Sequence, residues 1–214
     1  MFTRKLFDFL RELTRNNNRE WFIRNKPRYE TDVNAASLAF IEEMEPRLRK
    51  ISPYFEGSLM RIYRDVRFSK DKIPYNTHVG IPFRHVKGTV GFYLHLSPGD
   101  SFLGTGIWHP EPDALAPIRN RIASRGSEWK AARDHAAFRK AFGSLAGESL
   151  KRPPQGFAAD HPHIEDLKRK DFVAFAKVEP KEVLKPGFPD RAAASFAASK
   201  PLVKFICTAL GLPF

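Results

Sequence analysis

Cysteine, long apolar runs and blocks of like charge are all scarce in this chain of 214 residues. The one cysteine, Cys207, excludes an internal disulfide and any metal site made of several thiolates. No apolar run approaches the roughly 20 residues that cross a bilayer, and the charged, amphipathic start from Phe2 to Leu13 is unlike a signal peptide. The sequence therefore predicts a cytoplasmic protein with no membrane partner.

The basic excess is large but evenly spread. The formal net charge is +12, divided as +3, +3, +2 and +4 among residues 1–50, 51–100, 101–150 and 151–214. Folding could still gather these charges into a basic face that binds nucleic acid. A mildly basic surface all over the protein would give the same sum, so this pattern does not favour nucleic acid as the partner.

The composition is that of a globular protein. Hydrophobic residues make up 42% of the chain and include 19 phenylalanines, which argues against disorder. The length suits a single domain, residues 1–214, and no repeat or linker demands a second one. Cys207 lies in an apolar helical pattern, which predicts a buried structural thiol rather than a nucleophile.

The densest group of functional side chains lies between Arg61 and Tyr75, where five cations and two carboxylates share fifteen positions. Residues 59–68 are apolar, aromatic or β-branched often enough to predict a strand. Alternation would point Met60, Ile62, Val66 and Phe68 into a core, opposite a face formed by Arg61, Tyr63, Asp65 and Arg67. Arg64 would fall among the apolar residues, so it must pair with a carboxylate or be turned outward by a bulge.

This stretch is a candidate anion site. Arginine offers a planar fork for carboxylate or phosphate, lysine adds a mobile point charge, and Asp65 is placed to orient Arg67. The candidate ligand-binding residues are Arg61, Arg64, Asp65, Arg67, Lys70, Lys72, Tyr75, Tyr93 and His95. The alternative is a surface ion-pair ladder, in which Asp65 and Asp71 only balance the neighbouring cations.

A family resemblance rests on the same residues. The run Arg61-x-x-Arg64-Asp65-x-Arg67-Phe68-x-x-x-Lys72-x-Pro74-Tyr75 resembles the signature RxxRDxRFxxxKxPY of a mainly bacterial family of conserved hypothetical proteins, a domain of unknown function. Further similarity lies in residues 16–22, 106–112, 118–119, 154–156 and 161–162, so it covers nearly the whole chain. The resemblance implies that these residues form one site, and it implies no activity or cofactor.

The other strands are predicted near 81–85, 90–96, 102–109 and 172–178. Pro82 favours an edge position for the first of these. In 90–96, Tyr93 and His95 share the more polar face, and pairing with 59–68 would set them beside Arg61 and Arg67. The turn Ser97 to Asp100 predicts a hairpin of 90–96 with 102–109, and small residues at 104 and 106 leave room for a helix or a ligand.

Helical periodicity predicts helices over 3–14, from Asn17 to Ser52, over 112–125 and 127–142, and from 190 to 210. Asn17 is the predicted N-cap of the second helix, which restarts or kinks at Pro27. Residues 16–18 and Trp21 have an alternative interpretation as part of a pocket lining. The segment 143–160 is expected to be irregular, and Lys151, Arg152, His161 and His163 could bind an anion from a lid. His161-Pro162-His163 is too weak a motif to predict a metal site.

The expected fold is α+β, with a mainly antiparallel sheet packed against helices. The function favoured by the sequence is binding of a small anionic or phosphorylated ligand through residues 61–75, with His95 or Tyr75 as a proton-transfer partner if the protein is an enzyme. The alternatives are a non-enzymatic module for nucleic acid or an acidic protein partner, and a purely structural motif. Residue spacing assigns no reaction type, cofactor or oligomeric state.

Overall fold

The computed structural model describes residues 2–67 and 70–214, in which a first group of helices is followed by four consecutive strands, a second group of helices, a fifth strand and three final helices. The helices are α1 (Arg4–Arg15), α2 (Arg19–Arg28), the π-helix η1 (Tyr29–Ala35), α3 (Ala36–Ile51), α4 (Pro112–Ser124), α5 (Gly126–Arg133), α6 (Ala136–Phe142), α7 (Ile164–Leu167), α8 (Pro180–Val183), α9 (Phe188–Ala198) and α10 (Lys200–Ala209). The strands are β1 (Phe55–Gly57), β2 (Val79–His85), β3 (Gly91–Leu96), β4 (Phe102–Ile107) and β5 (Phe172–Lys177).

The five strands form one antiparallel sheet in the order β1-β2-β3-β4-β5. The predicted hairpin is confirmed as β3 and β4, and the predicted strand near 172–178 is confirmed as β5. The α+β fold with a mainly antiparallel sheet is therefore confirmed. No helix in the described part of the chain combines the length and apolar character needed to span a membrane.

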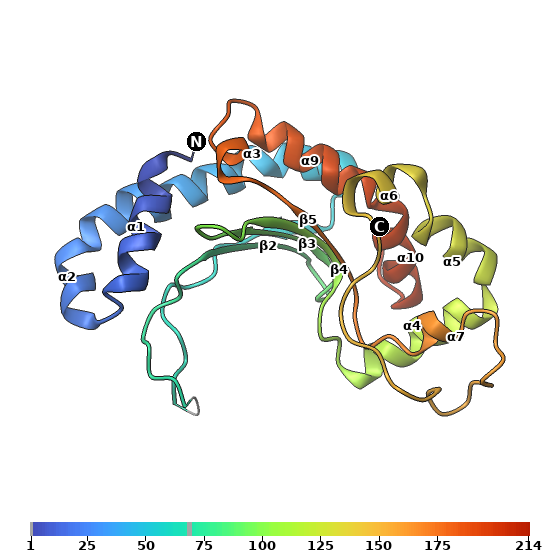
Figure 1. Cartoon of the computed structure of the whole chain (residues 1–214). Helices are drawn as coiled ribbons and strands as arrows, with labels where there is room; N and C mark the ends of the chain where they lie inside the picture. The colour runs from blue at the N-terminus through green and yellow to red at the C-terminus, as the bar shows by residue number, and fades with distance from the viewer. Residues whose placement is uncertain (1, 68–69) are drawn as a thin grey trace.

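The sheet is curved and carries its helices on the convex side, with α3 and α9 lying across it (Figure 1). Alternate residues of β2 and β3 point to this side and are buried. Phe196 of α9 packs over them, with ring centroids 5.9 Å from Phe83 and 4.9 Å from Phe92. The alternate buried residues of β2 and β3 and the facing side of α9, with its small residues, thus form one hydrophobic core.

A long helical rod connects the start of the chain to this core. The backbone stays helical from α2 through η1 to α3, so of the predicted restart or kink at Pro27 the restart is wrong, and the helix changes its geometry there without ending. Proline has no N–H to donate, and the helix here widens into π-turns immediately after it instead of ending. The predicted N-cap is also wrong by one residue, because the side chain of Asn18 accepts the hydrogen bond from the N–H of Trp21.

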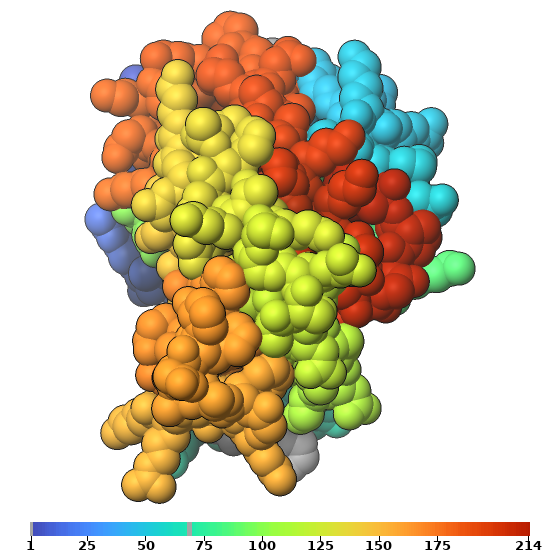
Figure 2. Space-filling view, turned by 90° about the vertical axis from the view of Figure 1, so that its right-hand side faces the viewer, coloured from blue at the N-terminus to red at the C-terminus, as the bar shows by residue number. Residues whose placement is uncertain are grey.

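Helices of the second half pack beside the sheet. The helix predicted over 112–125 is confirmed as α4, whereas the one over 127–142 is divided into α5 and α6. The last helix is likewise divided at Ser199 into α9 and α10. Seen from the side, α5, α6 and α10 form one continuous surface, and the segment 150–167 extends below them (Figure 2).

The strand predicted at 59–68 is not a strand of the sheet. Residues 58–67 and 70–76, called the arm below, leave the sheet after β1, project away from it and lead back into β2 (Figure 1). Among these residues, Ser58 and Met60 still donate backbone hydrogen bonds to β2, whereas Phe68 of the predicted strand lies outside the described residues. An apolar-rich stretch was sufficient to predict extended backbone, but it did not determine what that backbone pairs with.

Pro82 does not mark an edge strand, since β2 lies between β1 and β3. The register pairs Gly57, the last residue of β1, with Phe83, so Pro82 falls just past the end of β1. Ser58 donates to the carbonyl of Pro82, and proline cannot return the bond. The regular ladder of β1 with β2 ends there, and after the further bond from Met60 to Gly80 the arm leaves the sheet.

One border of the sheet is short and the other is partly covered. The border formed by β1 is a strand of three residues. At the other border, the segment 146–150 adds an isolated bridge from Ala146 to Val173 of β5 and another from Ser149 to Arg169, which precedes β5. These features leave the concave face, which no helix covers in Figure 1, as the accessible part of the sheet.

Candidate functional site

The base of the arm is firmly anchored. Tyr63 and Tyr75 form a bridge across it, and the ring of Tyr75 stacks on Phe22 of α2 with centroids 4.1 Å apart. The side chain of Asn17 accepts from the N–H of Tyr75 at 3.1 Å and donates to its carbonyl at 2.9 Å. Tyr75 is 4% exposed and does not line the groove described below. This candidate ligand residue therefore packs in the base of the arm and does not face that groove.

Most cations of the arm are engaged within the arm. Arg64 donates to Asp71 at 2.7 Å, which is the carboxylate pairing expected for this residue. It also donates to the carbonyl of Ile73. Arg67 binds Asp65 through two nitrogens, at 2.7 and 3.0 Å. These hydrogen bonds hold the pKa values of both carboxyl groups below their usual range.

Of the remaining cations, one is bonded to the backbone of the arm and two are exposed. Lys72 donates to the carbonyl of Val66 at 3.0 Å, while Arg61 and Lys70 are exposed. None of these side chains, nor Arg64 or Arg67, is among the described residues that line the groove on the sheet. The arm therefore presents a ladder of ion pairs with exposed cations along its length.

The concave face of the sheet is built from rows of residues paired across strands. One row runs Arg84, Gly91, Gly106, Val173 from β2 to β5, and the next runs Pro82, Tyr93, Gly104, Phe175. A third row places His95 opposite Phe102. Tyr93 and His95 thus share a face, as predicted, but the strand beside them is β2 and not 59–68, so the predicted pairing with the arm is wrong.

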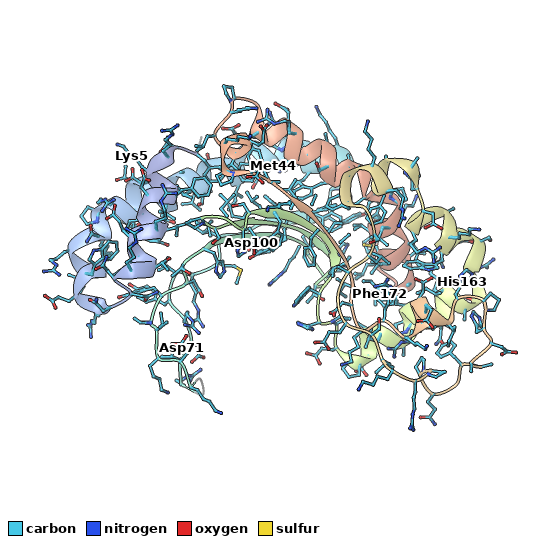
Figure 3. All side chains as sticks on the ribbon, in the orientation of Figure 1. Lys5, Met44, Asp71, Asp100, His163 and Phe172 are labelled. Carbon is cyan, nitrogen blue, oxygen red and sulfur yellow. The ribbon has the colours of Figure 1, made fainter. Side chains whose placement is uncertain are left out.

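These rows form the floor of a groove of about 680 Å³. Its lining is mainly apolar and aromatic, and in the described part of the chain it contains one cation, Arg84, and no carboxylate. Met60 and Trp108, 43% and 53% exposed, are the large apolar side chains that remain most open to solvent in it. The arm with Asp71 and the opposite segment with His163 descend on either side of this face (Figure 3).

Two histidines at the groove belong to a stack of rings. The ring of His95 lies between His78, at 4.5 Å, and Phe102, at 4.7 Å. Burial, with a further contribution from His78, lowers the pKa of His95 to about 4, and burial also lowers the pKa of His78. His95 is therefore a neutral imidazole at pH 7, able to accept or donate a hydrogen bond.

Tyr93 completes the polar part of the floor. Its hydroxyl lies 3.4 Å from Nδ1 of His95, and burial raises the pKa of Tyr93, an effect that Arg84 opposes. A neutral phenol and a neutral imidazole are thus presented side by side. Such a pair can recognise hydrogen-bonding groups on a ligand without adding charge to the groove.

Among the lining residues that sequence reasoning did not single out are His78, Arg84 and Phe175. A signal existed for two of them, since Arg84 alternates with the buried Phe83 and Phe175 stands opposite its core-facing neighbours in β5. The convergence of these residues depends on strand register, which alternation within one strand does not specify.

The segments proposed as a lid lie away from this floor. Lys151, Arg152, His161 and His163 are not among the described lining residues, and Nδ1 of His161 accepts from the N–H of His163. Nor does Trp21 line the groove, because its ring packs on Phe9 with centroids 5.5 Å apart. Two buried carboxylates instead hold the second half of the chain, Asp166 by accepting from Trp129 and Arg133, and Asp171 by accepting from the N–H groups of His109 and Glu148.

Comparison with known proteins gives a family and no further relative. The model of a family described as conserved hypothetical protein (DUF2461) matches residues 5–205. No curated protein and no solved structure matches the chain.

Proposed function

The chain belongs to the DUF2461 family of conserved hypothetical proteins, and from that premise we propose that it binds a small organic anion, phosphorylated or carboxylated, in the concave groove. The observation that carries this proposal is the union of an aromatic floor and one arginine in a single groove of about 680 Å³. Binding sites for small molecules are typically mainly apolar clefts of this size range, with a few convergent polar groups.

Different residues of the groove would contact different parts of the ligand. The aromatic rings of the floor would contact the apolar part of the ligand and remove it from water. Arg84 would meet the anionic group with a charge-assisted hydrogen bond, and Tyr93 and His95 would hydrogen-bond to neutral polar groups. A histidine with a pKa of about 4 is a weak base at neutral pH, so His95 suits recognition better than proton abstraction.

In this proposal the cations of residues 61–75 act at a distance. Arg61 follows Met60, which lines the groove, and the arm carries three more cations than carboxylates over 61–75. Exposed charges near a cleft raise the local concentration of anions and speed their arrival. The ion pairs of Arg64 and Arg67 would chiefly keep the arm in shape.

The test is titration calorimetry of wild type with phosphate, sulfate, nucleotides, sugar phosphates and polycarboxylates, repeated with Arg84→Gln. Loss of one charge-assisted hydrogen bond should weaken binding of the responding anion about tenfold or more. The matched control is Arg49→Gln on the exposed side of α3, which should bind as wild type does. Equal affinities for both variants would reject the groove as the anion site.

A second function is favoured by one observation, the net charge of +12 together with the exposed cations of the arm. It is a non-enzymatic module for nucleic acid or an acidic protein partner. Short DNA and RNA belong in the same screen, because their affinity would fall steeply between about 50 and 200 mM salt. If only polynucleotides bind and salt abolishes the effect, this second function replaces the first.

A further inference from the structure

Three glycines leave the centre of the concave face without side chains. Gly91 of β3 pairs directly with Gly106 of β4, and Gly104 lies one row away opposite Tyr93. All three line the groove, and we call them the glycine lane. Arg84 stands at the β2 end of the Gly91–Gly106 row, and Trp108 follows β4 at the other side of the groove.

The fold requires two of these glycines but not the third. A Cβ at Gly91 would collide with the carbonyl oxygen of Phe83, and one at Gly106, whose φ is +108°, would collide with that of Phe172. A Cβ at Gly104 would instead meet Tyr93 at 3.4 Å and the ring of Phe175 at 3.5 Å, which is ordinary contact. Alanine fits at 104, so the fold does not require the glycine at this position of the groove.

We propose that the lane receives a planar aromatic ring system with one anionic substituent, lying flat on the peptide planes with the substituent at Arg84. This inference rests on the proposed function of the groove and names its ligand class. Without side chains, the floor lets a ligand approach the backbone itself, as glycine does at other close approaches of ligand and main chain.

The shape of the lane selects for flatness. A planar ring places all of its atoms at contact distance from the floor, whereas a puckered saturated ring touches it with only part of them and loses the short-range dispersion contacts of the rest. The rings of Tyr93, Phe175 and Trp108 border the lane and can pack against the edges and outer face of the ligand. The uncharged imidazole of His95 adds a polar edge that does not repel an electron-rich ring.

Strand spacing limits the length. Neighbouring strands lie about 4.8 Å apart, so the floor from β2 to β5 measures about 14 Å. With the anionic group at the β2 end, the remaining space accepts two or three fused rings, or a base with its sugar. A nucleotide is one source of this chemistry and an aryl carboxylate or phosphate is another.

The experiment compares matched planar and saturated ligands by titration calorimetry. The probes are 2-naphthoate against decalin-2-carboxylate, and adenosine monophosphate against a short adenylate oligonucleotide. Planar naphthoate should bind at least tenfold more tightly than its saturated analogue. Gly104→Ala should weaken naphthoate several-fold and Gly104→Leu should abolish its binding, while circular dichroism and the melting temperature show that each variant is folded.

The outcomes separate this inference from the function on which it rests. If saturated and planar carboxylates bind equally and both depend on Arg84, the groove binds anions but the planar class is wrong. If folded Gly104→Leu or Gly104→Ala binds naphthoate as wild type does, the lane is not the site. If no probe depends on Arg84, the proposed function itself fails. Binding of adenosine monophosphate or of the oligonucleotide that Gly104→Leu blocks would support the inference. Whichever of the two binds more tightly than the other would then identify the source of the ring.

Discussion

The side-chain amide of Asn17 is bonded to both backbone groups of Tyr75, so a residue between two helices substitutes for the neighbouring strand that the arm lacks. The two residues are 58 positions apart in the chain. Together with the stack of Tyr75 on Phe22, this contact fixes where the arm leaves the body of the protein. The asparagine run near the start of the chain thus has a structural role beyond helix capping.

Asn17→Ala should lower the free energy of unfolding by about 1–3 kcal/mol, because it leaves the N–H and carbonyl of a buried residue without their partner. Urea denaturation measures this change. Asn16→Ala is the control. The side-chain amide of Asn16 donates to the carbonyl of Glu12 at the end of α1, and its loss should cost about 1 kcal/mol or less. The N–H groups of Arg64 and Asn76 donate across the arm to the carbonyls of Pro74 and Ile62, and their exchange should speed up in the first variant alone.

Asp166 fixes the second half of the molecule and is 5% exposed. It accepts from the indole of Trp129 at 2.8 Å and from Arg133 at 2.5 Å. Asp166→Ala should cost about 2–4 kcal/mol, since it leaves a buried indole N–H and a partly buried guanidinium short of a partner. The neighbouring exposed Glu165, changed to alanine, should shift unfolding by under about 0.5 kcal/mol. Equal losses in the two variants would show that Asp166 does not stabilise the fold in this way.

Acid should destabilise the protein through His95. Its pKa is about 4 in the folded state and near 6.5 when unfolded, so between these values the unfolded chain binds the proton and the folded chain does not. The stability that His95 contributes is complete above about pH 6.5 and is lost as the pH falls toward 4. Because solvent still reaches part of the ring, the loss should be on the order of 1–2 kcal/mol.

Denaturation from pH 4 to 7.5 tests this with His95→Phe, which keeps a ring between His78 and Phe102 and removes the titration. The variant should lose less stability than wild type on acidification. His135→Gln, at the exposed start of α6, is the control and should follow wild type. A wild-type slope in the His95→Phe protein would contradict the assignment.

The two arginine pairs of the arm should differ in their effect on stability. Arg64 is 30% exposed and joins residues on both sides of the arm, whereas Arg67 is 77% exposed and binds Asp65, two residues away. Arg64→Ala should therefore lower the melting temperature more than Arg67→Ala, which should leave it nearly unchanged. Scanning calorimetry measures both. A larger drop for Arg67→Ala would revive the purely structural interpretation of the signature.

Local pattern predicted the parts of the fold whose partners are close in sequence. The hairpin of β3 and β4 followed from alternation around Ser97 to Asp100, and α4 followed from its periodicity and its prolines. The arm was misjudged because Met60 and Ile62 alternate as in a sheet strand, yet Ile62 is buried without belonging to a strand of the sheet. Propensity predicts extended backbone, and tertiary contacts decide its partner.

The groove was only half predictable. Tyr93 and His95 were found because their alternation shows within one strand. Arg84 and Phe175 are 91 positions apart, and they meet in one groove only through the register of four strands. The signature residues drew attention to the arm, which stands beside the groove and does not form its floor.

The borders of the sheet also restrict how this chain can associate with others. In the described part of the chain, one border is a strand of three residues, and the bridge of Ala146 to Val173 interrupts the row of backbone groups at the other. Continuous sheets between molecules, the usual route to fibrous aggregates, find only a short template here. Self-assembly of the folded protein would have to proceed through side-chain surfaces, and concentrated solutions should not accumulate cross-β material.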